Sequence, residues 1–96
     1  MRTEEKIILE NALATYGQWA QILMCIEECA ELTNALAKLS RNRVTDAEII
    51  TELADVSIMV DQLAMMFGME RVYEKRQKKI QRLKERLEKA TKGDLP

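Results

Sequence analysis

The chain has 96 residues, of which 47% are hydrophobic, 32% are charged and 4% are aromatic, and its formal net charge is −1. This length predicts a single domain, residues 1–96, with a core small enough for self-association to be expected, and the composition favours an all-α fold. Because the chain contains no histidine, Ser-His-Asp and Cys-His catalysis and His-containing zinc or di-iron sites are excluded.

The charges are unevenly distributed along the sequence. Residues 70–92 contain ten Lys or Arg and four Glu, a balance of +6, so the other residues together carry −7. No stretch of about 18 uncharged apolar residues occurs, and no basic segment leads into an apolar one in the manner of a secretory signal. We therefore expect a cytoplasmic protein with no membrane partner, made of an acidic body and a basic C-terminal helix.

Periodicity and punctuation predict four helices. The first spans residues 4–14 with Thr3 as its N-cap, and it ends at a break near Tyr16 and Gly17. The second spans residues 18–39 and contains Cys25 and Cys29, four positions apart on one helix, where helical geometry disfavours a disulfide. We interpret both cysteines as reduced thiols of the core.

The third helix follows a loop at residues 40–44 and ends at Phe67. Thr45 and Glu48 form a capping-box pattern at its start, and Gly68 follows its end as a C-cap glycine. The fourth helix spans residues 70–91, and apolar residues in three-four spacing, interrupted by Arg76, give it a seam typical of a short coiled coil. The members of this seam are Tyr73, Ile80, Leu83, Leu87 and Ala90. Together the helices predict a four-helix bundle that is completed by oligomerisation.

Three glutamates lie in the segment CIEECAEL at residues 25–32. At about 100° per residue, Glu28 falls inside the apolar arc of the second helix. Glu31 falls at the margin of this arc, close to Lys38, whereas Glu27 faces the polar side. The arc itself consists of Met24, Cys25, Leu32, Ala35, Leu36 and Leu39.

The third helix repeats this arrangement. Glu52 lies on its apolar stripe, and Asp55 lies at the edge of the stripe as Glu31 does. The stripe consists of Ile49, Val56, Met59, Leu63 and Met66. The helix is apolar nearly all round, which favours a central position in an oligomer, with Asp61 on the opposite side available to pair with an arginine across an interface.

The four carboxylates need a compensating charge. Burying unpaired carboxylates is costly, and clustering them adds mutual repulsion. Apart from Lys38, neither apolar stripe carries a base. Mg²⁺ or Mn²⁺, which prefer oxygen ligands, would accept carboxylates from facing helices. A metal site is one interpretation of the pattern, and a buried network of salt bridges is the alternative.

The acidic pattern also resembles a known family. It reads E-E-x-x-E at Glu27, Glu28 and Glu31, then twenty intervening residues, then E-x-x-D at Glu52 and Asp55. This resembles the MazG-like all-α nucleoside triphosphate pyrophosphohydrolases, and the similarity covers residues 16–66, about half of the chain. It includes the lead-in at residues 17–21 and the ELADV stretch at residues 52–56.

The resemblance implies a magnesium-dependent hydrolase that splits a nucleoside triphosphate between its α and β phosphates, releasing a monophosphate and pyrophosphate. It implies that Glu28, Glu31, Glu52 and Asp55 hold the metal and form the catalytic centre, and that Glu27 supports these ligands by hydrogen bonding. It also implies a homodimer or homotetramer whose pocket draws on more than one subunit.

The same resemblance, together with charge, suggests the substrate-binding residues: Gln21, Lys38, Lys75, Lys79 and Arg82. In the fourth helix many family members carry a Lys followed by an Asn, whereas this chain has Lys79 and then Arg82 and Leu83. Basic side chains suit a triphosphate because they form charge-assisted hydrogen bonds to its oxygens. The alternative is that these bases form a solvated helix face.

We expect the bound metal to polarise the triphosphate and to lower the pKa of a water, whose proton a carboxylate accepts. Two other functions remain open. The chain could be a non-catalytic interaction module whose acids form salt bridges across an interface. Nucleic-acid binding through residues 70–92 is disfavoured by the interspersed glutamates and by the lack of aromatic residues there beyond Tyr73.

Overall fold

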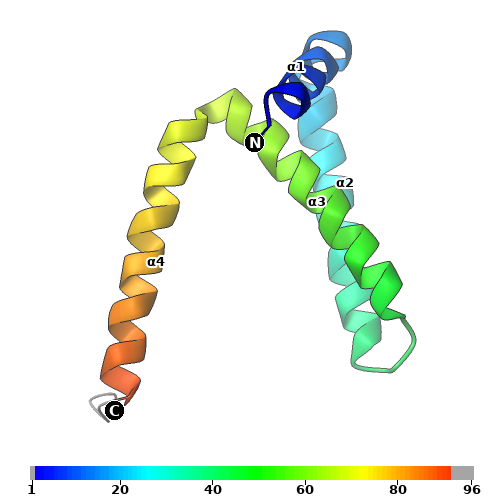
Figure 1. Ribbon diagram of the computed structural model, residues 1–96. Coiled ribbons are helices and arrows are strands. Elements are labelled where there is room, and N and C mark those ends of the chain that lie inside the picture. Colours follow the sequence, from blue (N-terminus) through cyan, green and yellow to red (C-terminus); the bar gives the residue numbers. More distant parts are fainter. Residues whose placement is uncertain (1, 92–96) are drawn as a thin grey trace. The chain divides into compact units, whose positions relative to one another are not determined.

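A computed structural model describes residues 2–91, and this part of the chain is helical with no strand. The four predicted helices are confirmed (Figure 1): α1 (Thr3–Tyr16), α2 (Gln18–Leu39), α3 (Asp46–Phe67) and α4 (Met69–Thr91). None of the helices in residues 2–91 combines the length and the apolar character of a membrane span. The structure divides into two compact units, Met1–Met66 and Phe67–Pro96, which are described separately.

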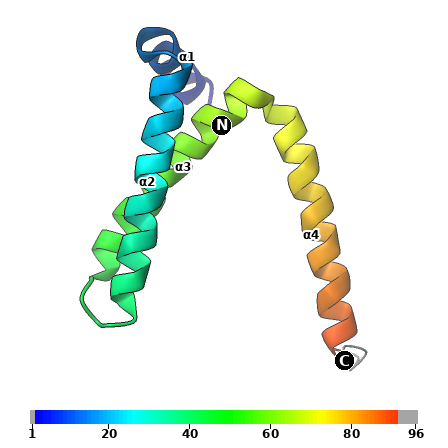
Figure 2. The same cartoon turned by 180° about the vertical axis from the view of Figure 1, so that it is seen from behind.

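The first unit contains α1, α2 and nearly all of α3. Figures 1 and 2 both show α2 and α3 side by side and running in opposite directions, with the loop between them at one end and α1 at the other. This antiparallel pair brings the acidic motif of α2 opposite the acidic motif of α3. It is therefore the element of the fold that positions the candidate site.

Glycine ends α1, as the sequence predicts. Gly17 has φ 89°, a left-handed conformation that residues with a Cβ rarely adopt, and its N–H donates to the Leu13 carbonyl at 2.9 Å. The start of α1 differs from the prediction. Arg2 occupies the N-cap position without a side-chain bond, and Thr3 is the first helical residue, so the expected Thr3 cap is wrong.

The turn after α2 is a Schellman motif. The Arg43 N–H donates to the Lys38 carbonyl and the Asn42 N–H donates to the Leu39 carbonyl, both at 3.0 Å. Asn42 has φ 55°, the left-handed conformation that this motif requires and that asparagine tolerates better than most residues. The turn folds the chain back, so that Arg43 lies beside the last turn of α2.

The predicted capping box begins α3. The Glu48 N–H donates to Thr45 Oγ1 at 3.2 Å, and the Thr45 N–H donates to Glu48 Oε2 at 2.9 Å. These reciprocal bonds satisfy backbone donors that the first turn of a helix leaves free. Together with the Schellman motif, they fix both ends of the short loop between α2 and α3.

A buried glutamine joins α1 to α3. Gln62 is 1% exposed, and its Nε2 donates to the Leu9 carbonyl at 2.7 Å. Because a buried amide is costly without a partner, this bond fixes how α1 lies against α3. The sequence analysis did not identify it, since Gln62 lies outside the predicted apolar stripe.

The core of the described chain is small. Its buried hydrophobic residues are Cys25, Ala35, Met59 and Ala64, and only Met59 belongs to the larger side chains. Three members of the predicted α2 arc, Met24, Leu36 and Leu39, are exposed instead, and so is Cys29, which is therefore not a core thiol. Both cysteines are free, as expected. The α2 arc is wider than the surface that α1 and α3 cover within this unit.

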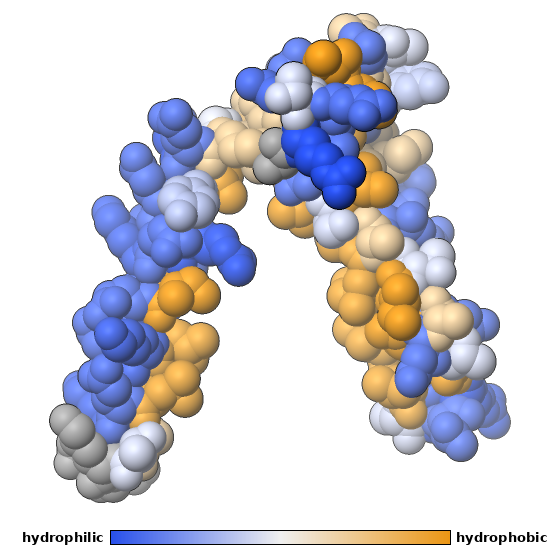
Figure 3. All heavy atoms as spheres, viewed as in Figure 1, coloured by the Kyte–Doolittle hydropathy of each residue, from blue (hydrophilic) through white to orange (hydrophobic). Residues whose placement is uncertain are grey.

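Large apolar side chains remain exposed on both long helices of the first unit. Figure 3 shows hydrophobic residues gathered over α2 and α3 on one face. The exposed large hydrophobic residues of α2 and α3 include Leu23, Ile26, Leu36, Ile50, Leu53 and Ile58, each about half exposed or more. Large exposed apolar surfaces on a small helical protein mark interaction sites.

The second unit consists of α4, preceded by Gly68. Gly68 has φ 112°, and a Cβ there would lie 3.0 Å from the Arg71 side chain, so glycine suits this junction. On α4 the seam residues Ile80, Leu83 and Leu87 line a shallow groove and are 47%, 50% and 58% exposed. Figure 3 shows a hydrophobic strip along α4 beside hydrophilic residues, which agrees with the predicted seam.

Candidate metal centre

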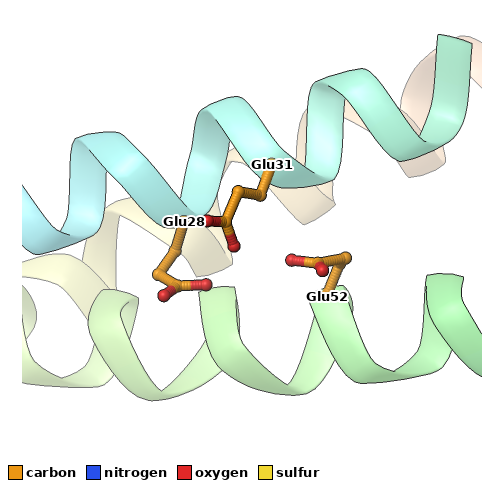
Figure 4. Close-up of side chains that lie close together, drawn as sticks. All are labelled: Glu28, Glu31 and Glu52. Carbon is orange, nitrogen blue, oxygen red and sulfur yellow. The ribbon is translucent and has the colours of Figure 1, made fainter.

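Three glutamates from α2 and α3 converge. One carboxylate oxygen from each of Glu28, Glu31 and Glu52 lies within 4.8 Å of the other two. Figure 4 shows Glu28 and Glu31 extending from α2 and Glu52 from α3 into the space between the two helices. We call these three residues the glutamate cluster. The structure thus brings together three of the four predicted ligands.

Two oxygens of the glutamate cluster are hidden from solvent without a partner. Glu28 Oε2 and Glu52 Oε2 are buried and accept no hydrogen bond. Buried acceptors are nearly always satisfied in folded proteins, so these two oxygens are free to accept a hydrogen bond or to bind a cation. Glu31, the third member, is exposed, as its position at the margin of the helix arc predicts.

The environment of the glutamate cluster opposes negative charge. Desolvation raises the pKa of Glu28 above its ordinary value, and the charges of Glu31, Asp55 and Glu52 raise it further. Desolvation also raises the pKa of Glu52, with added contributions from Glu31 and Asp55. A cation paired with either carboxylate would lower its pKa instead. Within residues 2–91 no base contributes to either shift, so the shifts disfavour a network of salt bridges at these two carboxylates.

Asp55 and Glu27 differ from the three converging glutamates. Asp55 is half-buried and close enough for its charge to act on Glu28 and Glu52, but it lies outside the group within 4.8 Å. It therefore lies at the edge of the cluster and is not one of its converging members. Glu27 is exposed on the polar side of α2, as predicted.

A polar cavity of about 260 Å³ adjoins the glutamate cluster. Its lining comes from α2, the following loop and the first turns of α3: Glu31, Asn34, Ala35, Lys38, Arg43, Val44, Glu48 and Glu52. Pockets for whole small molecules usually measure about 300–1,000 Å³. This cavity is therefore suited to a part of a ligand, and its lining includes both carboxylates and bases.

Among the predicted substrate-binding residues, only Lys38 lines this cavity. Gln21 is buried at 5% exposure, two helical turns before Glu28. Lys75, Lys79 and Arg82 are exposed on α4, which belongs to the other unit, so their role stays a prediction.

The sequence analysis missed Arg43 and Glu48 as lining residues of the cavity. Glu48 was assigned to the capping box, which it forms, but its side chain also borders the cavity. The sequence analysis assigned Arg43 to the loop at residues 40–44 and gave its side chain no function. The signal that identifies it is Asn42, three residues after Leu39 at the end of α2, because an asparagine there suits a left-handed turn that folds the chain back and places the next residue, Arg43, beside the helix.

No protein-family model matches the chain, and neither a curated protein nor a solved structure matches it. The assignment of a function therefore depends on the geometry and chemistry of the site itself.

The donor set fits a hard divalent cation. All three converging ligands are carboxylates, two of their oxygens are buried and unpaired, and desolvation together with neighbouring negative charges raises the pKa of Glu28 and of Glu52. Mg²⁺ and Mn²⁺ prefer oxygen ligands, and Mg²⁺ in particular is commonly held by a few carboxylates together with substrate phosphates. Glu28, Glu31 and Glu52 would hold such an ion, with Asp55 at its edge.

Proposed function

We propose that this chain is a magnesium-dependent nucleoside triphosphate pyrophosphohydrolase of the MazG-like type. It cleaves a nucleoside or deoxynucleoside triphosphate to the monophosphate and pyrophosphate. The observation that carries the proposal is the convergence of Glu28, Glu31 and Glu52 within 4.8 Å, with two buried oxygens that lack partners. The acidic pattern of the sequence, which resembles this family, supports the same function.

The carboxylates have two tasks in this proposal. Glu28, Glu31 and Glu52 bind one or more divalent ions between α2 and α3, with Asp55 completing the set. Such an ion, when bound, neutralises charge on the triphosphate and activates water for attack. Glu27 lies on the neighbouring polar face and orients a ligand by hydrogen bonding.

The proposed reaction is the hydrolysis of the phosphoanhydride bond between the α and β phosphates. A water oxygen forms a bond to the α-phosphorus, and the bond from that phosphorus to the α–β bridging oxygen breaks. The electron pair of the broken bond stays on the bridging oxygen, which leaves as part of pyrophosphate. A carboxylate at the edge of the site accepts the proton that the water loses. Lys38, which lines the cavity, binds phosphate oxygens, and a phosphate-binding role for Lys75, Lys79 and Arg82 of α4 stays a prediction from the sequence.

The active form is a homodimer or homotetramer, which we infer from the exposed apolar surface. Ile50, Leu53 and Ile58 on α3 are 64%, 50% and 50% exposed, although α3 is the most apolar helix of the chain. A second copy packed on α2 and α3 would cover these side chains and add residues to the cavity. A cytoplasmic location, where nucleoside triphosphates are abundant, remains a prediction.

The test is a substrate panel with product identification. The purified chain is incubated with each common nucleoside and deoxynucleoside triphosphate and Mg²⁺, and products are separated by anion exchange. Monophosphate and pyrophosphate should form in equal amounts. Glu52→Gln should abolish the reaction, whereas Glu10→Gln, which neutralises an exposed glutamate of α1, should leave it unchanged. Release of a diphosphate and inorganic phosphate would contradict cleavage between the α and β phosphates.

One observation favours a different function. The small core and the exposed apolar faces also suit a helical interaction module, in which the glutamate cluster meets bases of a partner. This alternative predicts that Mg²⁺ leaves thermal stability unchanged and that no triphosphate is hydrolysed. The buried unpaired oxygens, which a metal would relieve, favour a metal centre, and the acidic pattern of the sequence leads from a metal centre to the hydrolase.

A further inference from the structure

The polar cavity next to the glutamate cluster is lined by charges of both signs. Glu31 and Glu52 border it on the side of the cluster, and Lys38 and Arg43 border it near the α2–α3 loop. Glu48 also borders it there, with its Oε2 accepting a hydrogen bond from the Thr45 N–H. Lys38 lies seven residues after Glu31, a separation of about 10.5 Å along the helix axis. Helical side chains lean towards the N-terminus of their helix, so the lysine extends back towards the cluster. An anion that begins at the cluster would therefore meet two cations further along.

The backbone holds these two cations together. The Arg43 N–H donates to the carbonyl of Lys38 itself at 3.0 Å, so the two residues are neighbours although five positions separate them. The left-handed Asn42 makes this bond possible. Two further bonds, from Arg41 to Lys38 and from Asn42 to Leu39, both at 3.0 Å, fix the same turn. The position of Arg43 is thus set by the backbone rather than by a flexible loop.

We propose that Arg43, together with Lys38, binds the terminal phosphates of the substrate, which become the pyrophosphate product. The inference rests on the proposed function. It assigns a direction to the ligand, with the α-phosphate at the glutamate cluster and the β and γ phosphates extending towards the α2–α3 loop. A planar guanidinium suits this task because it donates two parallel hydrogen bonds to phosphate oxygens.

The size and lining of the cavity support this direction. At about 260 Å³ it is smaller than a typical pocket for a whole ligand, but its lining is mainly polar and charged. A nucleobase would find few apolar side chains there, since Ala35 and Val44 are the apolar members of the lining. The phosphates therefore occupy the cavity, and the nucleoside lies outside it.

The experiment compares Arg43→Ala with Arg41→Ala. Arg41 lies in the same turn and is also exposed, but it is not part of the cavity lining, so it is a matched control for charge and position. Loss of hydrogen bonds between charged groups typically costs a factor of about 10 to 100 in binding. For Arg43→Ala we expect KM to rise by that factor, and inhibition by added pyrophosphate to weaken equally. Inhibition by the nucleoside monophosphate should not change, and Arg41→Ala should behave as the wild type.

A conservative variant and three alternative outcomes separate this inference from the proposed function. Arg43→Lys should recover part of the affinity, because it restores the charge without the two parallel bonds. If the wild type hydrolyses triphosphate while Arg43→Ala and Arg41→Ala have the same KM and the same inhibition by pyrophosphate, this inference is wrong and the proposed function stands. If Arg43→Ala weakens monophosphate inhibition instead, the ligand lies in the opposite direction. If the wild type cleaves no triphosphate, both proposals fail.

Discussion

The glutamate cluster should make the metal-free chain less stable than a variant with one carboxylate fewer. Three carboxylates within 4.8 Å form three repelling pairs, and replacing one of them leaves a single pair. In Glu52→Gln the new amide also donates a hydrogen bond to a neighbouring carboxylate. Because the pKa of Glu52 is raised by burial and by Glu31 and Asp55, the charged form is the unfavourable one. We therefore expect metal-free Glu52→Gln to melt above the metal-free wild type.

Magnesium should reverse this order. At about ten times its dissociation constant, a ligand that binds only the folded state stabilises it by RT ln 11, about 1.4 kcal/mol. For a chain of this size that corresponds to a rise in Tm of about 6–11 °C. The wild type should show this rise, and Glu52→Gln should lose most of it.

The assay is thermal unfolding followed by circular dichroism, with and without Mg²⁺, at one fixed protein concentration, because oligomerisation also makes Tm depend on concentration. Glu10→Gln is the control, since this exposed glutamate of α1 lies outside the cluster. A wild-type Tm that neither Mg²⁺ nor Mn²⁺ changes would refute the metal centre. A metal-free Glu52→Gln that melts no higher than the wild type would refute the argument from repulsion.

Two other predictions concern pH and the turn after α2. Because burial and neighbouring acids raise the folded-state pKa values of Glu28 and Glu52 above the ordinary value of a glutamate, the folded chain binds more protons than the unfolded chain in the pH window between the two values. The stability of the metal-free protein should therefore fall as pH rises through that window, and Mg²⁺ should oppose the fall. Urea midpoints at several pH values test this, and a midpoint that rises with pH in the absence of metal would contradict it. At Asn42, whose φ is 55°, we expect Asn42→Gly to keep stability and KM. Asn42→Val should lose about 1–2 kcal/mol and raise KM by displacing Arg43. Equal melting temperatures and KM values for the two variants would show that the turn does not position the arginine.

The sequence determined the helices and their punctuation, because these depend on local interactions. Gly17 and Gly68 adopt the left-handed conformations that glycine permits, and Thr45 and Glu48 form the capping box that their spacing predicts. The periodicity of α2 and α3 also placed Glu28 and Glu52 on inner faces, since residues on one face of a helix recur at a fixed angle.

Only the tertiary structure decided what those faces meet. Helical periodicity gives the direction of a side chain but not the distance to the next helix. The approach of the three glutamates, the exclusion of Asp55 from their group and the exposure of Leu36 therefore appear only after α2 and α3 pack together. The hydrogen bond from Gln62 to Leu9 connects residues 53 positions apart. Arg43 lines the cavity because the turn after α2 folds the backbone back towards Lys38. Such contacts depend on how the whole chain folds, which no local pattern specifies.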